Sequence, residues 1–381
     1  PDGEWRLIDG GAGLPYEDVT SVAAAGGVLL AGTKIGAARL SGGEWEYFQS
    51  GRYLPDDYVN SAALAPGGKP WLATPGGVSR IEYREMTLEE KAAYYQGEVE
   101  KFDRFAFIGD MPLAERGDLS TIYPKAHDNE NVWTGMYIAA ECFQYGATGD
   151  EAARRRAKRS LDMMLFLDEV TGVPGYFARS ASKPSRDDWK GGGEWHGSAD
   201  GEWVWKSDTS SDEVVGRFFG FSVFYDVCGG EKEKERIRNS VARTMDYIIE
   251  NDYYLLDIDG KPTTWGKWNP EFFKTEGKFQ KNLNSLEILS FLKAAHYMTG
   301  EKRFFDAYAY LIKEHGYAHN AVNAKIDQPS IMNHSDDLLA FLSYYPLLKY
   351  ETHPKLREDY FLKSIRRTWR VVREKKNPLW N

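Results

Sequence analysis

A helix that is apolar on nearly every side is the feature that most constrains the fold of this chain. The polar segment from Lys206 to Glu213 leads directly into the apolar run from Val214 to Phe221. A helix without a polar face must be buried all round, so only its polar start can meet water or a ligand. The same plan recurs three times, with polar starts at 127–131, 282–285 and 333–337 before apolar runs at 132–143, 286–298 and 338–348. We therefore expect four buried helices whose polar starts surround one cleft.

A second kind of helix alternates with these buried ones. After each apolar run comes a short turn and then a helix with a single apolar stripe, which is typical of an outer helix with one face in water. The stripes are Ala153, Ala157, Leu161, Met164 and Leu165; Ile237, Val241, Met245 and Ile248; Phe304, Tyr308, Leu311 and Ile312; and Phe361, Ile365, Trp369 and Val372. Inner and outer helices in alternation predict a mainly α fold, an (α/α) toroid over residues 86–381 that is either closed or an incomplete ring of helical hairpins.

Two further features belong to this predicted helical domain. A capping box of Thr87 with Glu90 is expected to begin its first helix, which extends to about residue 104. Long polar and aromatic stretches at 171–207 and 252–281 separate the helix pairs. Loops of this length are uncommon unless they carry a function, so we expect both to line a site.

Residues 1–82 contain an internal repeat with a period of about 40 residues. Glu4-Trp5, Leu14-Pro15 and Thr33 recur as Glu44-Trp45, Leu54-Pro55 and Thr74. Short alternating segments punctuated by glycine predict a small antiparallel β region of two propeller-blade-like repeats. Two blades cannot close a propeller, so their edges must be covered by the helical domain, by another subunit or by further blades. We favour the helical domain.

Composition excludes several partners. The net charge of −9 and the lack of a basic run argue against nucleic acid, which requires a Lys/Arg patch. No apolar run approaches the ~20 residues of a membrane span. The two cysteines, Cys142 and Cys228, lie in apolar helices and are expected to be core residues. The chain begins at Pro1, which either a removed targeting segment or a shortened chain would explain, and we expect an exported, periplasmic or extracellular protein. Sequence alone does not specify an oligomeric state.

The polar helix starts supply most of the candidate functional residues. Ser210, Ser211, Asn284 and Ser335 are most simply interpreted as helix caps. The candidate catalytic residues are His127, His334, Tyr123, Asp128, Asp208, Asp212 and Asp336, and the candidate substrate-binding residues are Asn129, Trp133, His196, Lys206, Arg217, Trp268 and Asn333. For Lys206 and Arg217 a salt bridge with Asp208 or Asp212 is the simpler explanation. No cofactor is certain: two histidines beside acids are ligands that a divalent metal can use, but their spacing matches no metal motif.

Three functions fit these residues. Elimination on a uronate needs a base, an acid and a group that neutralises the carboxylate, for which His127 or His334, Tyr123, and Asn129 with Arg217 or a metal are the right types. Hydrolysis of a glycoside with inversion needs two carboxyl groups ~6.5–9.5 Å apart, drawn from Asp128, Asp212 and Asp336. A non-catalytic glycan-binding protein would need only stacking rings such as Trp133, Trp195, Trp203 and Trp268.

The motifs resemble those of known polysaccharide-degrading enzymes. The turn at Leu54-Pro55 and the segment from Trp71 to Gly77 resemble the two-component-regulator type of propeller repeat. Together with the motifs at 206–213 and 333–337, they make the chain similar to carbohydrate-active α/α-toroid enzymes with propeller-type repeats, and in particular to rhamnose-glucuronate polysaccharide lyases. The resemblance implies β-elimination on a uronic-acid-containing polysaccharide. We therefore predict a polysaccharide lyase first, an inverting glycoside hydrolase second and a glycan-binding protein third.

Overall fold

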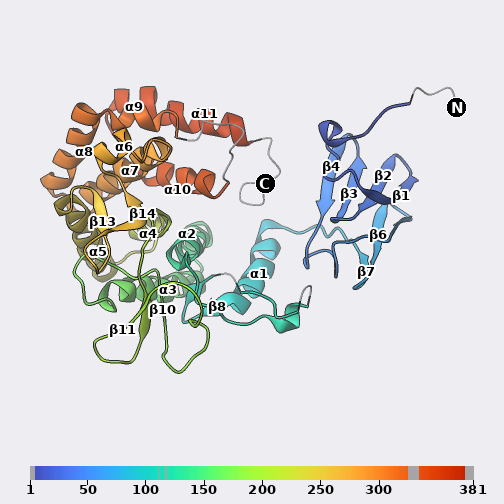
Figure 1. The fold of residues 1–381 in the computed structure, drawn as a ribbon, viewed down its shortest axis with the longest axis horizontal. Coiled ribbons are helices and arrows are strands. Elements are labelled where there is room, and N and C mark those ends of the chain that lie inside the picture. Colours follow the sequence, from blue (N-terminus) through green and yellow to red (C-terminus); the bar gives the residue numbers. More distant parts are fainter. Residues whose placement is uncertain (1–4, 110, 116–117, 325–333, 374–381) are drawn as a thin grey trace. The chain divides into compact units, whose positions relative to one another are not determined.

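The computed structural model describes residues 5–109, 111–115, 118–324 and 334–373, and the chain divides into two compact units (Figure 1). Unit 1 comprises residues 1–101 and 111–125, and unit 2 comprises residues 102–110 and 126–381. The sequence-based boundary between residues 82 and 86 falls inside unit 1. In the described ranges, no helix has both the length and the apolar character that a membrane span requires.

Unit 1 contains two antiparallel sheets, as the repeat predicts. The first has the order β1 (Val19–Ala25), β2 (Val28–Thr33), β3 (Ala37–Ser41), β4 (Glu44–Phe48), and the second has the order β5 (Ser61–Ala65), β6 (Lys69–Thr74), β7 (Gly77–Arg80). Equivalent residues of the two repeats make the same hydrogen bond. The Thr33 hydroxyl donates to the Gly36 carbonyl at 2.8 Å, and the Thr74 hydroxyl donates to the Gly77 carbonyl at 3.0 Å. The sequence repeat is therefore also a repeat of local structure.

The rest of unit 1 is short helices. Helix α1 (Leu88–Val99) begins with the predicted capping box: the Glu90 amide donates to the Thr87 hydroxyl at 3.1 Å and the Thr87 amide donates to the Glu90 carboxylate at 2.8 Å. Single 3-10 turns lie at η1 (Gly10–Ala12), η2 (Glu100–Phe102), which extends into unit 2, and η3 (Leu119–Thr121).

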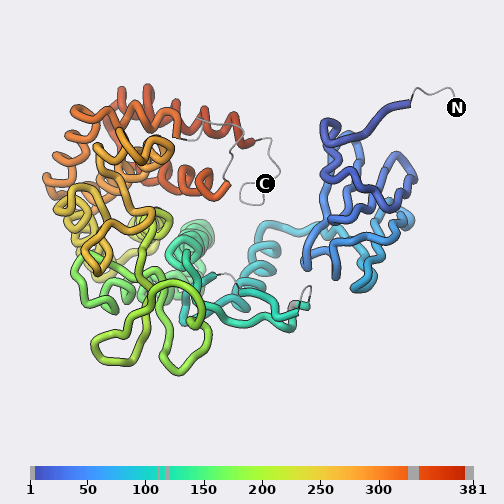
Figure 2. Tube along the Cα trace, viewed as in Figure 1, coloured from blue at the N-terminus to red at the C-terminus, as the bar shows by residue number. Residues whose placement is uncertain are grey.

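Unit 2 is mainly helical, and its helices follow one another along the chain with short strands between some of them (Figure 2). Its helices are α2 (Glu130–Thr148), α3 (Glu151–Glu169), α4 (Ser211–Val227), α5 (Glu231–Glu250), α6 (Pro270–Lys274), α7 (Lys281–Thr299), α8 (Lys302–His315), α9 (Tyr317–Ala321), α10 (His334–Tyr350), the π-helical η4 (Leu356–Leu362) and α11 (Lys363–Val372). Its strands are β8 (Asp103–Arg104), β9 (Phe107–Ile108), β10 (Ser180–Ser182), β11 (Trp195–Gly197), β12 (Val204–Lys206), β13 (Tyr254–Leu256) and β14 (Pro262–Lys267).

The alternation of buried and amphipathic helices is present in unit 2. Helix α4 contacts α2, α7 and α10, and α7 contacts α10, while α3, α5 and α8 pack on these helices. The buried helices carry core side chains such as Phe221 and Leu289, and the stripe residues Leu161, Met245 and Leu311 are buried as predicted. Trp369 departs from its predicted stripe, since it is 43% exposed, although its ring makes a T-shaped contact with that of Phe341 at a centroid distance of 6.2 Å.

Glycines hold α2 and α4 unusually close together. A Cβ atom on Gly135 would overlap the Gly216 carbonyl, and a Cβ on Gly220 would approach the Gly135 backbone. Contacts of Asn131 with Glu213 near the helix starts and of Gly146 with Val227 near the ends show that the two helices run parallel. Parallel packing brings their polar N-terminal ends to the same place.

Candidate functional site

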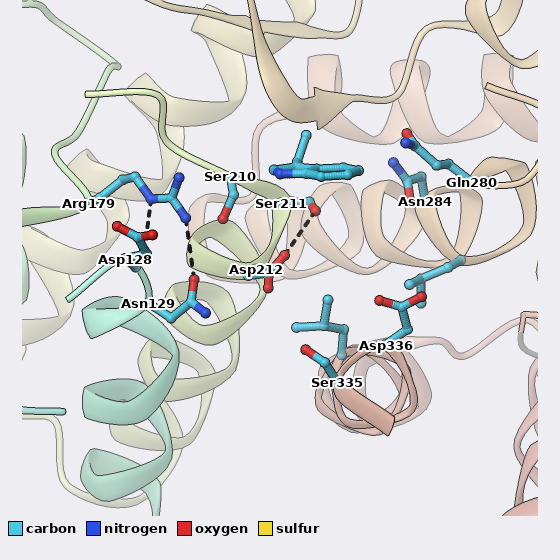
Figure 3. A pocket seen from close by; sticks show the side chains of 13 residues that line it. Asp128, Asn129, Arg179, Ser210, Ser211, Asp212, Gln280, Asn284, Ser335 and Asp336 are labelled. Atoms are coloured by element: carbon cyan, nitrogen blue, oxygen red, sulfur yellow. Dashed lines mark hydrogen bonds between the residues drawn. The ribbon is translucent and has the colours of Figure 1, made fainter. Parts of the chain in front are cut away.

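The polar helix starts meet around one cavity of about 350 Å³ (Figure 3). It is lined by Asp128, Asn129, Arg179, Ser210, Ser211, Asp212, Trp265, Gln280, Leu283, Asn284, Ser335, Asp336 and Leu339. These residues come from the N-terminal ends of α2, α4, α7 and α10 and from the two long connections. The polar starts of the four helices therefore lie around one cavity, as expected from the sequence.

Two N-cap residues at the cavity make no side-chain capping bond, and one of them is Ser210, which the sequence suggested as a cap. Ser210 is the N-cap of α4 and Gln280 is the N-cap of α7, but neither side chain makes a capping bond. The Ser210 Oγ and the Gln280 Oε1 are buried and have no hydrogen-bond partner among the described residues. A buried polar atom without a partner costs about 1–3 kcal/mol. A ligand with hydroxyl groups would remove that cost.

Asp212 and Asp336 bring two carboxyl groups to the cavity from different helices, α4 and α10. Burial raises the pKa of the Asp212 carboxyl, and the negative charge of Asp336 adds to this, while a backbone hydrogen bond and the charge of Arg179 oppose it. The Ser211 hydroxyl lies 3.4 Å from Asp212 Oδ1. A carboxyl group whose pKa is raised in this way is suited to donate a proton.

Asp128 differs from Asp212 because it has a cationic partner. Lys206 from β12 forms an ion pair with its carboxylate. Burial alone would raise the pKa of Asp128, but the bond from Lys206 and the charge of Arg179 hold that pKa below its usual value. Asp128 is therefore suited to remain an anion rather than to give up a proton.

Arg179 was not predicted from the sequence, and it contributes a buried cation to the cavity wall. Its Nε donates to the Asp128 carbonyl at 2.8 Å, its Nη1 to the Asp208 carbonyl at 2.9 Å and its Nη2 to Asn129 Oδ1 at 3.4 Å. Its contact with the Asp208 carboxylate is looser, with 3.9 Å between Nη1 and Oδ2. In Figure 3, Arg179 and Asn129 lie on one side of the cavity and Gln280 on the other.

Asp208 supports the cavity wall from outside the set of lining residues. Its backbone is in the left-handed region at φ 56°. Its carbonyl holds Arg179, and its Oδ1 accepts from the Thr264 amide at 2.7 Å. The residue next to Thr264 is Trp265, which lines the cavity and is 50% exposed. Asp208 thus joins the connection after α3 to the hairpin of β13 and β14.

The two candidate histidines do not line the cavity. His334 Nδ1 lies 3.1 Å from Asp337 Oδ2, and the backbone amide of His127 donates to Glu130 Oε1 at 3.3 Å. His196 Nε2 lies 3.1 Å from Ser207 Oγ. Tyr123 belongs to unit 1, and Asn333 lies outside the described residues.

Three candidate substrate-binding residues are packed into unit 2 instead. Arg217 is 1% exposed and donates to the Met164 carbonyl at 2.7 Å and to the Asp168 carboxylate. Trp268 is fully buried, with its indole N–H on Glu287 at 3.0 Å. Trp133 is partly buried against the core. The expected salt bridges of Lys206 and Arg217 do form, but with Asp128 and Asp168 rather than with Asp208 or Asp212.

Sequence reasoning missed Arg179 and Gln280 and did not choose Trp265 as a binding residue. All three lie in the two long stretches expected to line a site, which is the sequence signal that could have found them. Among the residues with described positions, no group of three or more His, Cys, Asp and Glu side chains could hold a metal ion.

Comparison of the chain with protein-family models, with curated proteins and with solved structures gave no match.

Proposed function

We propose that unit 2 is a glycoside hydrolase in which Asp212 is the general acid and Asp336 is the general base. The observation that carries the proposal is that both carboxyl groups line one cavity and that burial together with the charge of Asp336 raises the pKa of Asp212. A pair of carboxyl groups at one site, one of which acts as the acid, is the usual equipment for cleaving a glycosidic bond.

The reaction needs no group beyond these two and a water molecule. Asp212 donates its proton to the glycosidic oxygen, so that the leaving sugar departs as an alcohol. The Asp336 carboxylate accepts a proton from a water molecule that attacks the anomeric carbon from the opposite face. A single displacement inverts the configuration at that carbon.

A sugar fits the rest of the cavity. Trp265 offers a half-exposed aromatic ring, on which the apolar face of a sugar can stack. The buried Ser210 Oγ and Gln280 Oε1 offer hydrogen bonds to hydroxyl groups. Arg179 offers a guanidinium fork, which pairs with a carboxylate in two parallel bonds. We infer that the substrate is a polysaccharide or oligosaccharide that contains a uronic acid.

Elimination, the reaction predicted first, has less support. Its predicted base and acid are His127, His334 and Tyr123, and within the described residues no histidine or tyrosine lines the cavity. Arg179 could neutralise a uronate carboxylate in a lyase as well as in a hydrolase. A protein that only binds glycans would not need Asp212 with a raised pKa.

Unit 2 is mainly helical, and unit 1 contains two small antiparallel sheets. We propose that α2 to α11 are the hairpins of an incomplete (α/α) toroid and that residues 1–82 are two propeller-type blades. Such an architecture, with its cavity at the starts of the inner helices, fits an exported glycan-degrading enzyme.

The test is a screen of the purified protein against a panel of uronic-acid polysaccharides, with two readouts. New reducing ends without near-ultraviolet absorbance are expected, because only elimination leaves an unsaturated sugar. Asp212→Asn should abolish the signal, whereas Asp187→Asn should not, because that side chain is 86% exposed and outside the cavity. An absorbing product would establish the lyase, and affinity without turnover would establish the glycan-binding protein.

A further inference from the structure

Glu213 is a buried carboxyl group directly behind the cavity that the proposed reaction does not use. It follows Asp212 in α4, is 0% exposed and is not a lining residue. Its Oε2 accepts two bonds from Asn131 of α2, from the backbone amide at 3.1 Å and from Nδ2 at 2.5 Å. Its Oε1 has no hydrogen-bond partner among the described residues.

Asn131 connects Glu213 to the wall of the cavity. The Asn131 Nδ2 also lies 3.3 Å from the Ala178 carbonyl and 3.4 Å from the Arg179 carbonyl. Its Oδ1 accepts from Arg217 Nη1 at 3.3 Å. Glu213 therefore fixes Asn131, and Asn131 fixes the backbone that carries Arg179. The contacts form one buried network across α2, α4 and the connection after α3.

The charges around Glu213 decide which form of the carboxyl group is accommodated. Arg179 from the connection after α3 and Arg217 from the next turn of α4 favour the anion, and Asp212 on its own helix opposes it. Arg217 is already paired with Asp168 of α3. Burial dominates over these charges and raises the pKa of Glu213 to about 8. The two bonds from Asn131 also favour the anion and oppose the effect of burial. In the neutral acid, Oε2 is the carbonyl that accepts these bonds, and Oε1, which has no partner among the described residues, carries the proton.

We propose that Glu213 is a positioning residue that works as a neutral acid: it holds Asn131 and the Arg179 backbone in place, and it keeps negative charge away from Asp212. If Glu213 ionised, a second anion beside Asp212 would make the loss of the Asp212 proton harder. The role in catalysis rests on the proposed function, but the neutral state and the positioning do not.

Glu213→Gln is the matched variant, because glutamine reproduces the neutral acid with an oxygen for Asn131 and cannot ionise. The pKa of Glu213 is higher in the folded protein than in the unfolded chain. Its contribution to stability is therefore full below the pKa of the unfolded chain and is lost as pH rises through the pKa of the folded protein. The melting temperature of Glu213→Gln minus that of wild type should therefore increase between about pH 5 and about pH 8. The surface variant Glu231→Gln, at a side chain 84% exposed, should show no such trend. A difference for Glu213→Gln that does not change with pH would overturn the neutral state.

Hydrogen exchange tests the positioning without any substrate. In Glu213→Ala, the peptides that contain Asn131 and the segment 178–179 should exchange faster than in wild type, and in Glu213→Gln they should not. If the alanine variant does not fold, faster exchange of those peptides in Glu213→Gln would count against the proposal, and unchanged exchange would support it. Equal exchange in wild type and a folded alanine variant would overturn the positioning role.

With an active substrate in hand, kcat/KM of Glu213→Gln should keep its neutral-pH value. A loss of kcat/KM at neutral pH in Glu213→Gln as large as the loss in Asp212→Asn would overturn the role of Glu213 as a positioning residue. Failure to find any substrate would count against the proposed hydrolase alone, because the melting and exchange measurements decide the state and the positioning of Glu213.

Discussion

Asp336 at the start of α10 lines the same cavity as Asp212 at the start of α4, and its charge helps to raise the pKa of the Asp212 carboxyl. Each carboxyl group thus forms part of the environment of the other. Removing the charge of Asp336 should make Asp212 a stronger acid, so the two residues must be tested separately and together.

Asparagine at either position should reduce kcat by about 100- to 10,000-fold, because general acid–base catalysis contributes rate factors of that size. The double variant should be little worse than the worse single variant, because acid and base act in one step. Steady-state rates on an active uronic-acid glycan provide the measurement, with Asp187→Asn as the control. Losses that multiply fully in the double variant would show that the residues act independently.

The stability of Asp212→Asn should depend on pH in a defined direction. Because the pKa of Asp212 is raised in the folded protein, its contribution to stability is present below the unfolded pKa and is lost as pH rises through the folded value. Asparagine has no such loss. Urea unfolding between about pH 4 and about pH 7 should therefore show the variant gaining on wild type as pH rises. A variant that instead loses stability relative to wild type as pH rises would mean that the folded protein favours the charged carboxylate.

Arg179→Gln should remove the preference for acidic substrates more than it removes activity in general. A hydrogen bond to a charged group contributes about 1.5–3 kcal/mol, so the ratio of kcat/KM for an acidic glycan to that for its carboxyl-reduced form should fall by roughly 10- to 150-fold. The ratio cancels general damage to the site. Arg303→Gln, which removes ion pairs with Asp246 and Glu301 outside the cavity, is the matched control. An unchanged ratio in Arg179→Gln would assign the carboxylate to another residue.

Two neighbouring tryptophans should separate binding from stability. Trp265 is 50% exposed at the cavity, so Trp265→Ala should weaken glycan binding by about twofold to tenfold and leave the melting temperature almost unchanged. Trp268 is fully buried, so Trp268→Ala should lower the free energy of unfolding by about 3–5 kcal/mol. Isothermal titration and urea unfolding measure the two effects, and a similar loss of stability in both variants would contradict the assignment.

The close approach of α2 and α4 should tolerate no side chain at Gly135. Its Cβ would meet the Gly216 backbone, which cannot move aside as a side chain can, so Gly135→Ala should cost about 3 kcal/mol or more in unfolding free energy. Gly97 in α1 is the control: a Cβ there meets nothing within 4 Å, and alanine should stabilise by about 0.5–1 kcal/mol. If Gly135→Ala were as stable as wild type, the two backbones could not be so close.

The sequence alone determined the helices of unit 2, the strands of unit 1 and the places where function should be sought. Periodicity predicts which face of a helix is buried, so the apolar helices and the stripes at Leu161, Met245 and Leu311 could be recognised without any contact. The repeat that equates Thr33 with Thr74 and the capping box of Thr87 with Glu90 are likewise local patterns, and local bonds satisfy them. Long polar connections indicated where the cavity would be lined.

Only the tertiary structure decided which residue of each type enters the cavity. Arginine, tryptophan and aspartate read the same in a sequence whether they are buried or exposed, and their environment depends on partners far along the chain. Arg217 is neutralised by Asp168 in the interior, whereas Arg179 is held at the cavity by the carbonyls of Asp128 and Asp208. Trp268 packs in the core and Trp265 does not. The pKa of Asp212 was decided in the same way, because burial and the charge of Asp336 exist only once α4 and α10 have packed together.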